Sequence, residues 1–294
     1  MTTAMKGTKT IALAAAALLF TGCFHDFHER QPGTGRIIPE FQWQFDEDIN
    51  SPVHHLLLVV DGADGYYSKV YGSPAEFAEE PLNLQAGDYK LLFAANMSEA
   101  DGYLLDGVPP TRSLADNPIS ARRQASTIHP DQTWFAITPV TVVEGAGTRI
   151  RPEFQRLMAH LRVNVTNAPA GATVTATVVN AAKSVDLTGE SDSRRAGRPS
   201  EDTAPNVIAN GQAAYLMPSA SGQEGGRVVL SVTDANGKTS TFDCNTPLME
   251  SGKSYQLNVD FNELRAEMTL TSTPINDWED VWTIQGEIPD PLSI

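Results

Sequence analysis

Cys23 is the residue whose setting most clearly specifies a chemical reaction. Its thiol, once ionised, is a nucleophile that can be joined covalently to another molecule. Ten apolar residues, Ile11–Phe20, come before it, with two small residues between. At ~1.5 Å rise per residue this run spans about 15 Å, half of a bilayer core, so it is too short for a transmembrane helix. Lys6 and Lys9 precede the run, which completes the layout of a secretory signal.

The residues around Cys23 resemble the lipobox of bacterial lipoproteins, although Phe20 stands where leucine is usual and Leu19 lies one place earlier. The resemblance implies removal of residues 1–22 and attachment of several acyl chains, such as palmitate, to Cys23. Each buried CH₂ contributes about 0.8 kcal/mol, so several chains anchor stably. An ordinary signal with a chance cysteine is the alternative, and it is disfavoured because the chain has only two cysteines. Polar residues 23–36 then form a flexible tether.

The other ionisable side chains show no recognisable catalytic spacing. His25, Asp26, His28 and Glu29 lie in the tether, where a solvated spacer is commoner than a metal site. The segment Asp61–Gly65 lacks the ligand series of a calcium loop and is more typical of a hairpin turn.

Histidines and the second cysteine suggest structural roles. One of His54 and His55 should face inward and the other outward, whereas His129 lies in a loop and His160 opens a strand. Cys244 is expected to be a small buried residue. No nucleophile elbow, P-loop or zinc-binding helix occurs, although a glycosidase carboxylate pair stays open. We therefore predict that the protein is not an enzyme and holds no metal or cofactor.

Charge restricts the partners. The chain carries 36 acidic and 21 basic side chains, a net charge of −15 at pH 7. Such a surface repels nucleic-acid phosphates, so no nucleic-acid partner is expected. The same excess of acids argues against a polybasic membrane patch. With Cys23 used for lipid, no internal disulfide can form.

Alternating apolar residues predict strands throughout the chain beyond the tether. Phe41, Trp43 and Phe45 fall on every second residue, which predicts a strand with one apolar face. The same alternation recurs at residues 161–165, 174–178, 228–232 and 255–261. His55–Val60 is a continuous apolar run, typical of a strand buried on both faces.

Turn residues divide the chain further. Residues 82–94 predict one hairpin, and residues 227–241 predict another with Asn236-Gly237 in its turn. Residues 98–131 read as a long loop with a short helix around Ser120–Ala125, and residues 145–148 as a domain joint. Many short strands without long helices predict an all-β protein of two antiparallel β-sandwiches, at residues 37–146 and 150–294.

Five segments together resemble the fimbrillin-like lipoproteins of Bacteroidales. They are the lipidated leader, Phe41–Phe45, Leu84–Tyr89, Leu248–Leu257 and Pro274–Trp278. The resemblance implies two transthyretin-like sandwiches and a role as a pilus subunit, accessory subunit or anchor. The protein would then reside on the outer membrane and in the fimbrium, with other fimbrial subunits as partners.

In that family an arginine-specific protease removes the first strand of shaft subunits, and a strand from a neighbour fills the groove by β-augmentation. Arg36 is the corresponding candidate cleavage site here. Cleavage at Arg36 would leave the aromatic strand attached, which departs from the shaft pattern and favours an anchor or accessory subunit. The segment 283–294 is a candidate donor strand or a free tail.

Two further possibilities remain from the residues. A surface glycan-binding lipoprotein is the alternative function, with Trp43, Trp134, Trp278 and Trp282 as candidate stacking residues. Thr203 follows Asp202 in a polar segment and resembles an O-glycosylation site of Bacteroidetes.

Overall fold

A computed structural model describes the fold of this protein. It describes residues 33–41, 53–62, 65–80, 82–108, 113–124, 132–188, 195–196, 207–220, 225–261, 265–271 and 283–287. Contacts gather the chain from Pro32 onward into one compact unit.

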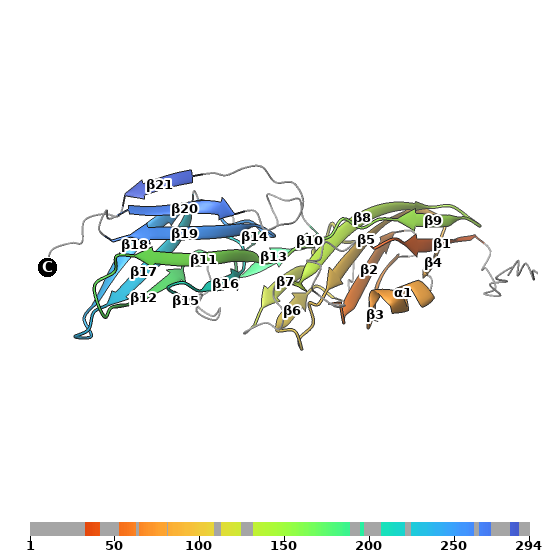
Figure 1. Cartoon of the computed structure of the whole chain (residues 1–294). Coiled ribbons are helices and arrows are strands. Elements are labelled where there is room, and N and C mark those ends of the chain that lie inside the picture. The colour runs from red at the N-terminus through yellow and green to blue at the C-terminus, as the bar shows by residue number, and fades with distance from the viewer. Residues whose placement is uncertain are drawn as a thin grey trace, which may run out of the picture. The chain divides into compact units, whose positions relative to one another are not determined.

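Strands dominate the described chain (Figure 1). Residues 33–156 contain β1 (Thr34–Pro39), β2 (Leu56–Gly62), β3 (Gly65–Tyr71), α1 (Pro74–Glu79), β4 (Leu82–Gln85), β5 (Gly87–Ala95), β6 (Tyr103–Asp106), β7 (Ser120–Arg123), β8 (Trp134–Val142), β9 (Gly147–Ile150) and β10 (Gln155–Arg156). The later residues contain β11 (Ala159–Thr166), β12 (Thr173–Val178), β13 (Ser184–Asp186), β14 (Arg195–Ala196), β15 (Val207–Ala209), β16 (Ala213–Leu216), β17 (Gly226–Thr233), β18 (Thr239–Thr246), β19 (Ser254–Asp260), β20 (Arg265–Thr271) and β21 (Thr283–Glu287). The all-β class predicted from alternation is confirmed.

Two sheets form the first half. One has the order β4-β1-β9 and the other the order β10-β8-β5-β2-β3. Strand β2 shows why its sequence is a continuous apolar run. Leu56 and Leu58 face the core shared with β1 and β4, whereas Leu57 and Val59 face a second core. All four are buried, so the prediction of a strand buried on both faces is confirmed.

The predicted hairpin at residues 82–94 is wrong. Strand β4 pairs with β1, whereas β5 pairs with β2 and β8. Only Ala86 lies between β4 and β5, so the chain steps from one sheet to the other instead of turning back on itself. Leu84 and Phe93 thereby enter the same core from opposite sheets.

The predicted helix at Ser120–Ala125 is also wrong. Residues 120–123 form β7, which pairs with β6 and with β13. Ala121 is fully buried opposite Val185. Pairing with a distant strand therefore overrides the local preference.

The second half repeats the arrangement of the first. Its two sheets have the orders β16-β11-β19-β20-β21 and β15-β12-β17-β18. The first strand of each half lies between an antiparallel and a parallel neighbour: β1 between β4 and β9, and β11 between β16 and β19. Two parallel pairings thus occur within otherwise antiparallel sheets.

The predicted hairpin at residues 227–241 is confirmed. Strands β17 and β18 pair from Gly226 opposite Thr246 to Thr233 opposite Thr239. Gly237 adopts φ +84° in the turn. The side chain of Asp234 accepts hydrogen bonds from the backbone N–H groups of Asn236 and Lys238, which fixes the turn.

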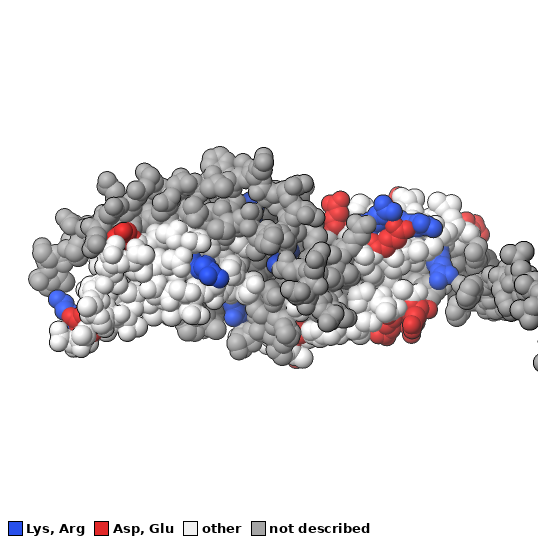
Figure 2. Space-filling view, in the orientation of Figure 1, with Lys and Arg blue, Asp and Glu red and all other residues white. Residues whose placement is uncertain are grey.

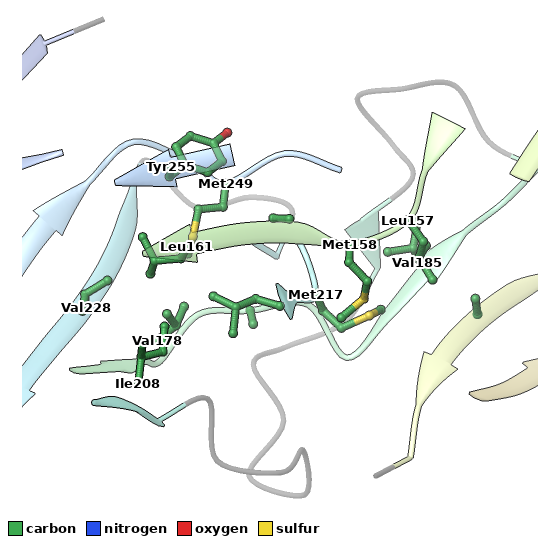
Figure 3. Packing of buried hydrophobic residues seen from close by; sticks show 14 of the residues in the cluster. Leu157, Met158, Leu161, Val178, Val185, Ile208, Met217, Val228, Met249 and Tyr255 are labelled. Carbon is green, nitrogen blue, oxygen red and sulfur yellow. The ribbon is translucent and has the colours of Figure 1, made fainter. Parts of the chain in front are cut away.

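The segment leading into β19 also behaves as its sequence indicates. Gly252 has φ +75°, and Tyr255, Leu257 and Val259 are buried. The Tyr255 hydroxyl donates to the carbonyl of Leu248 at 3.2 Å. Figure 3 shows Tyr255 among the apolar side chains that strands of both sheets, such as β11 and β17, contribute to this core.

A fifth sheet, β14-β13-β7-β6, joins the halves because β13 comes from the second and β7 from the first. Residues 145–148 lie at the turn into β9, which pairs with β1.

Candidate assembly site around β1

Strand β1 lies in the middle of its sheet, hydrogen-bonded on both sides. Its antiparallel pairing with β4 runs from Thr34 opposite Gln85 to Ile37 opposite Leu82. Its parallel pairing with β9 begins with Arg36 opposite Gly147. An extended strand with partners on both edges offers no free backbone to another protein.

The core-facing side of β1 is closely packed. Ile37 is fully buried in the core shared with Leu84 and Ile150. Gly35 allows the strand to approach its neighbour, because a Cβ there would lie 2.4 Å from the carbonyl oxygen of Val143. A side chain at position 35 would therefore clash with the segment that joins β8 to β9 and displace β1.

The start of β1 is held by hydrogen bonds from two segments. The N–H of Gly33 donates to Oε1 of Glu144 at 2.9 Å, and the N–H of Ala86 donates to the Gly33 carbonyl at 2.8 Å. These contacts fix the strand at the side that leads back toward Cys23 in the sequence.

The end of β1 is held by a pair of arginines. The carboxylate of Glu40 accepts from Arg151 Nε at 2.6 Å and from Arg149 Nη1 at 3.1 Å. The hydrogen bond from Arg151, together with the charges of both arginines, holds the pKa of Glu40 below its ordinary value. Basic and acidic side chains lie close together near β8 and β9 in the surface view (Figure 2).

Arg36, the candidate cleavage site, lies inside β1 and not ahead of it. Its backbone N–H donates to the Ala146 carbonyl at 2.9 Å. A cut at Arg36 would divide the strand, and a protease acts on backbone that has first left its pairing. Three of the predicted features lie outside the described residues: Cys23, Thr203 and the aromatic strand beyond Phe41.

Phe41 itself is described and packs at the end of β1. Its ring makes edge contacts with Phe77 and Phe93, with centroids 5.7 Å away in both cases. Of the four tryptophans proposed for glycan stacking, Trp134 is buried in β8 and the other three lie outside the described residues.

A polar cluster beside β2 was not found from the sequence. His54 Nε2 lies 2.6 Å from Asp101 Oδ1, and the other oxygen of Asp101 accepts from the N–H and hydroxyl of Ser98. Burial raises the pKa of Asp101, but the hydrogen bonds from Ser98 and His54 outweigh it and hold the pKa below its ordinary value. Asn96, with φ +55°, accepts from the His54 N–H. Its positive φ could not be read from the sequence.

The remaining histidines and the cysteine have structural settings. His54 is exposed and His55 half-buried, with its pKa lowered by burial. The ring of His160 packs against that of Tyr215 in a tilted arrangement, with centroids 4.9 Å apart. Cys244 is buried as predicted, and burial, followed by the charge of Asp243, raises its pKa to about 11. At that pKa the thiolate is scarce at neutral pH, so the residue is a poor nucleophile.

Within the described ranges, no three His, Cys, Asp or Glu side chains gather as metal ligands. No helix there has the length and apolarity needed to span a membrane.

The described fold is all-β, with several packed sheets and a first strand that is paired on both edges. The chain belongs to the family of fimbrillin-A associated anchor proteins Mfa1 and Mfa2, whose model matches residues 58–283. The resemblance drawn from the leader and the strand segments is thereby confirmed, and with it a fimbrial accessory role.

Similar solved structures include a proposed polysaccharide-binding protein from Bacteroides thetaiotaomicron, with 12% identity and a TM-score of 0.50 over 85% of this chain and 98% of that one. The fimbrial anchor protein Mfa2 from Porphyromonas gingivalis has 12% identity and a TM-score of 0.48, covering 84% and 100%. A fimbrial assembly protein from Parabacteroides distasonis has 12% identity and a TM-score of 0.48, covering 86% and 99%. A comparison with curated protein sequences finds no match.

Proposed function

We propose that this protein is a lipid-anchored accessory subunit that holds surface fimbriae to the outer membrane. Cys23 is the attachment point for lipid, and the β-sheets are the contact surfaces for other fimbrial subunits. Two sandwiches, predicted at residues 37–146 and 150–294, are the proposed domains. The first begins with β1, so the tether from Cys23 ends before Thr34.

The firm pairing of β1 is the observation that supports an anchor over a shaft subunit in this proposal. The strand is paired on both edges, Ile37 is fully buried, and contacts to Glu144 and Arg151 hold its two ends. A subunit that keeps β1 also keeps its covalent connection to Cys23. A shaft subunit, by contrast, must release its first strand to open a groove for its neighbour.

Mass spectrometry of the mature N-terminus, from protein purified out of its native membrane, tests this proposal. We expect an acylated Cys23 as the first residue. A chain that begins at Ile37 contradicts the anchoring role and indicates a subunit processed for polymerisation.

The Cys23→Ala variant provides the matched functional test. We expect fimbriae to appear in the culture medium instead of on the cells, because the subunit still folds but has lost its lipid. Fimbriae that stay attached to cells carrying only this variant contradict the proposal.

A further inference from the structure

One face of strands β2, β5 and β8 changes from apolar to polar along the strands. The row containing Val59, Leu92 and Ile137 contributes to the core. The next row on the same face places Asp61 opposite Lys90, which in turn lies opposite Pro139.

A second polar row follows. Asp88 lies opposite Thr141, whose hydroxyl donates to Asp88 Oδ1 at 2.6 Å. Two carboxylates, an ammonium group and a hydroxyl therefore share one end of this sheet face.

These polar rows line a groove. A hollow of about 470 Å³ is bordered by Asp61, Asp88, Lys90 and Thr141. A second hollow of about 220 Å³ shares Lys90 with it and extends toward Leu114. The larger hollow opens widely to solvent, so it fits a ligand that lies on the sheet face with one side exposed.

The wall of the groove is fixed in place. The N–H of Leu114 donates to Asp61 Oδ2 at 2.9 Å, and the Leu114 side chain is buried. Asp61 therefore has a defined orientation, with its second oxygen still able to accept a hydrogen bond.

An exposed aromatic ring borders the same row. Tyr66 of β3 lies opposite Asp61 and has 40% of its surface exposed. The edge strand thus places a large apolar ring, with a hydroxyl at its tip, next to the carboxylates.

Several ligand classes do not fit this groove. Strand addition to β2 or β5, which carry Asp61 and Lys90, is excluded because both strands are already paired on both sides. Nucleic acid does not fit a chain of net charge −15 with one lysine in the groove. A divalent cation lacks a ligand set, because within the described residues no three candidate ligands gather.

We propose that this groove, lined by Asp61, Asp88, Lys90 and Thr141 and flanked by Tyr66 on the next strand, binds a neutral saccharide. Sugar hydroxyls donate to the carboxylates and accept from the lysine ammonium. The apolar C–H face of a sugar ring packs on Tyr66. Two carboxylates against one ammonium disfavour sialylated or sulfated sugars. This site goes beyond the anchoring role and requires no other fimbrial subunit.

A printed array of defined neutral and acidic glycans, probed with the purified chain from residue 24 onward, tests the proposal. We expect binding among the neutral glycans, followed by titration of the strongest one in solution. Tyr66→Ala removes the stacking ring. Asp88→Asn removes a charge while leaving an oxygen for the Thr141 hydroxyl. Each change is expected to weaken binding about tenfold, equivalent to roughly 1.4 kcal/mol.

Two matched variants serve as controls. Val70→Ala is the control for Tyr66→Ala, because it changes an exposed residue of the same strand, β3. Asp243→Asn is the control for Asp88→Asn, because it removes an exposed acid in the second half. Both should bind as the parent does, and thermal unfolding checks that all four variants are folded. An array on which no glycan binds overturns the proposal. So does a glycan that Tyr66→Ala and Asp88→Asn bind with the same affinity as the parent. Loss of subunit co-purification in Tyr66→Ala without any glycan binding would instead identify the groove as a protein contact.

Discussion

Gly35 lies so close to Val143 that β1 has no room for a side chain at that position. A Cβ on Gly35 would lie 2.4 Å from the Val143 carbonyl oxygen. The close approach packs β1 against the segment between β8 and β9, next to Arg36, which is paired with β4 and β9.

The Gly35→Ala variant should therefore loosen β1. We expect a loss of about 1–3 kcal/mol in the free energy of unfolding, the usual result of overpacking. An arginine-specific protease should cut after Arg36 faster than in the parent, as followed by N-terminal sequencing. Val143→Ala, at a side chain that is 57% exposed, is the control and should leave the rate unchanged. Equal rates in Gly35→Ala and the parent would show that β1 is not held by this contact.

Acid should weaken the contact at the end of β1. Because the folded pKa of Glu40 is lowered, its stabilising contribution is complete above the unfolded value of about 4.3 and is lost as the pH falls through the lower folded value. The parent should melt higher than Glu40→Gln at pH 7, and the difference should disappear in strong acid. Thermal unfolding followed by circular dichroism, repeated from pH 7 down to strong acid, measures this difference. For Glu99→Gln, which changes an exposed acid, the difference in melting temperature from the parent should not vary with pH. A difference that is constant with pH contradicts the assignment.

Phe77 is the buried side chain of α1 and contacts Tyr71 at a centroid distance of 4.7 Å. Phe77→Ala should lower the free energy of unfolding by about 3–5 kcal/mol, because it leaves a cavity in a closely packed aromatic cluster. Urea unfolding measures this loss. Glu79→Ala, on the exposed side of the same helix, should change stability little. Similar midpoints for the two variants would contradict the packing described.

Asp101→Asn should destabilise the loop after β5. The carboxylate uses both oxygens, one toward His54 and one toward Ser98, whereas an amide can accept on only one side. We expect a loss of roughly 1–3 kcal/mol in urea unfolding. The control is Asp106→Asn, at a side chain that is 57% exposed. If Asp106→Asn lowers the free energy of unfolding by as much, the hydrogen bonds of Asp101 do not account for the loss.

Thr203 is the predicted O-glycosylation site. Both the parent and Thr203→Ala should carry the lipid on Cys23 when made in the native host, so the variant should be lighter by the mass of a glycan in addition to the mass of the substitution. An intact-mass difference equal to the substitution alone contradicts glycosylation at Thr203.

Alternation along the chain was sufficient to predict much of the core. The buried residues Leu161, Val163 and Val165 of β11 and Tyr255, Leu257 and Val259 of β19 follow directly from it. The turn at Gly237 was equally readable, because a positive φ has a strong residue preference. Both signals are local, since a side chain's face depends only on its position along the strand.

The sequence by itself determined the strand class, the lipidation motif and the family resemblance, because each depends on residues near one another in the chain. Tertiary structure alone decided which strands pair. It separated β4 from β5 and made β7 a strand. It also brought Asp61, Lys90 and Tyr66 into neighbouring positions and placed Arg36 inside a sheet. Pairing is fixed by long-range contacts that bury both faces of the sheets at once, and that information lies in no single segment.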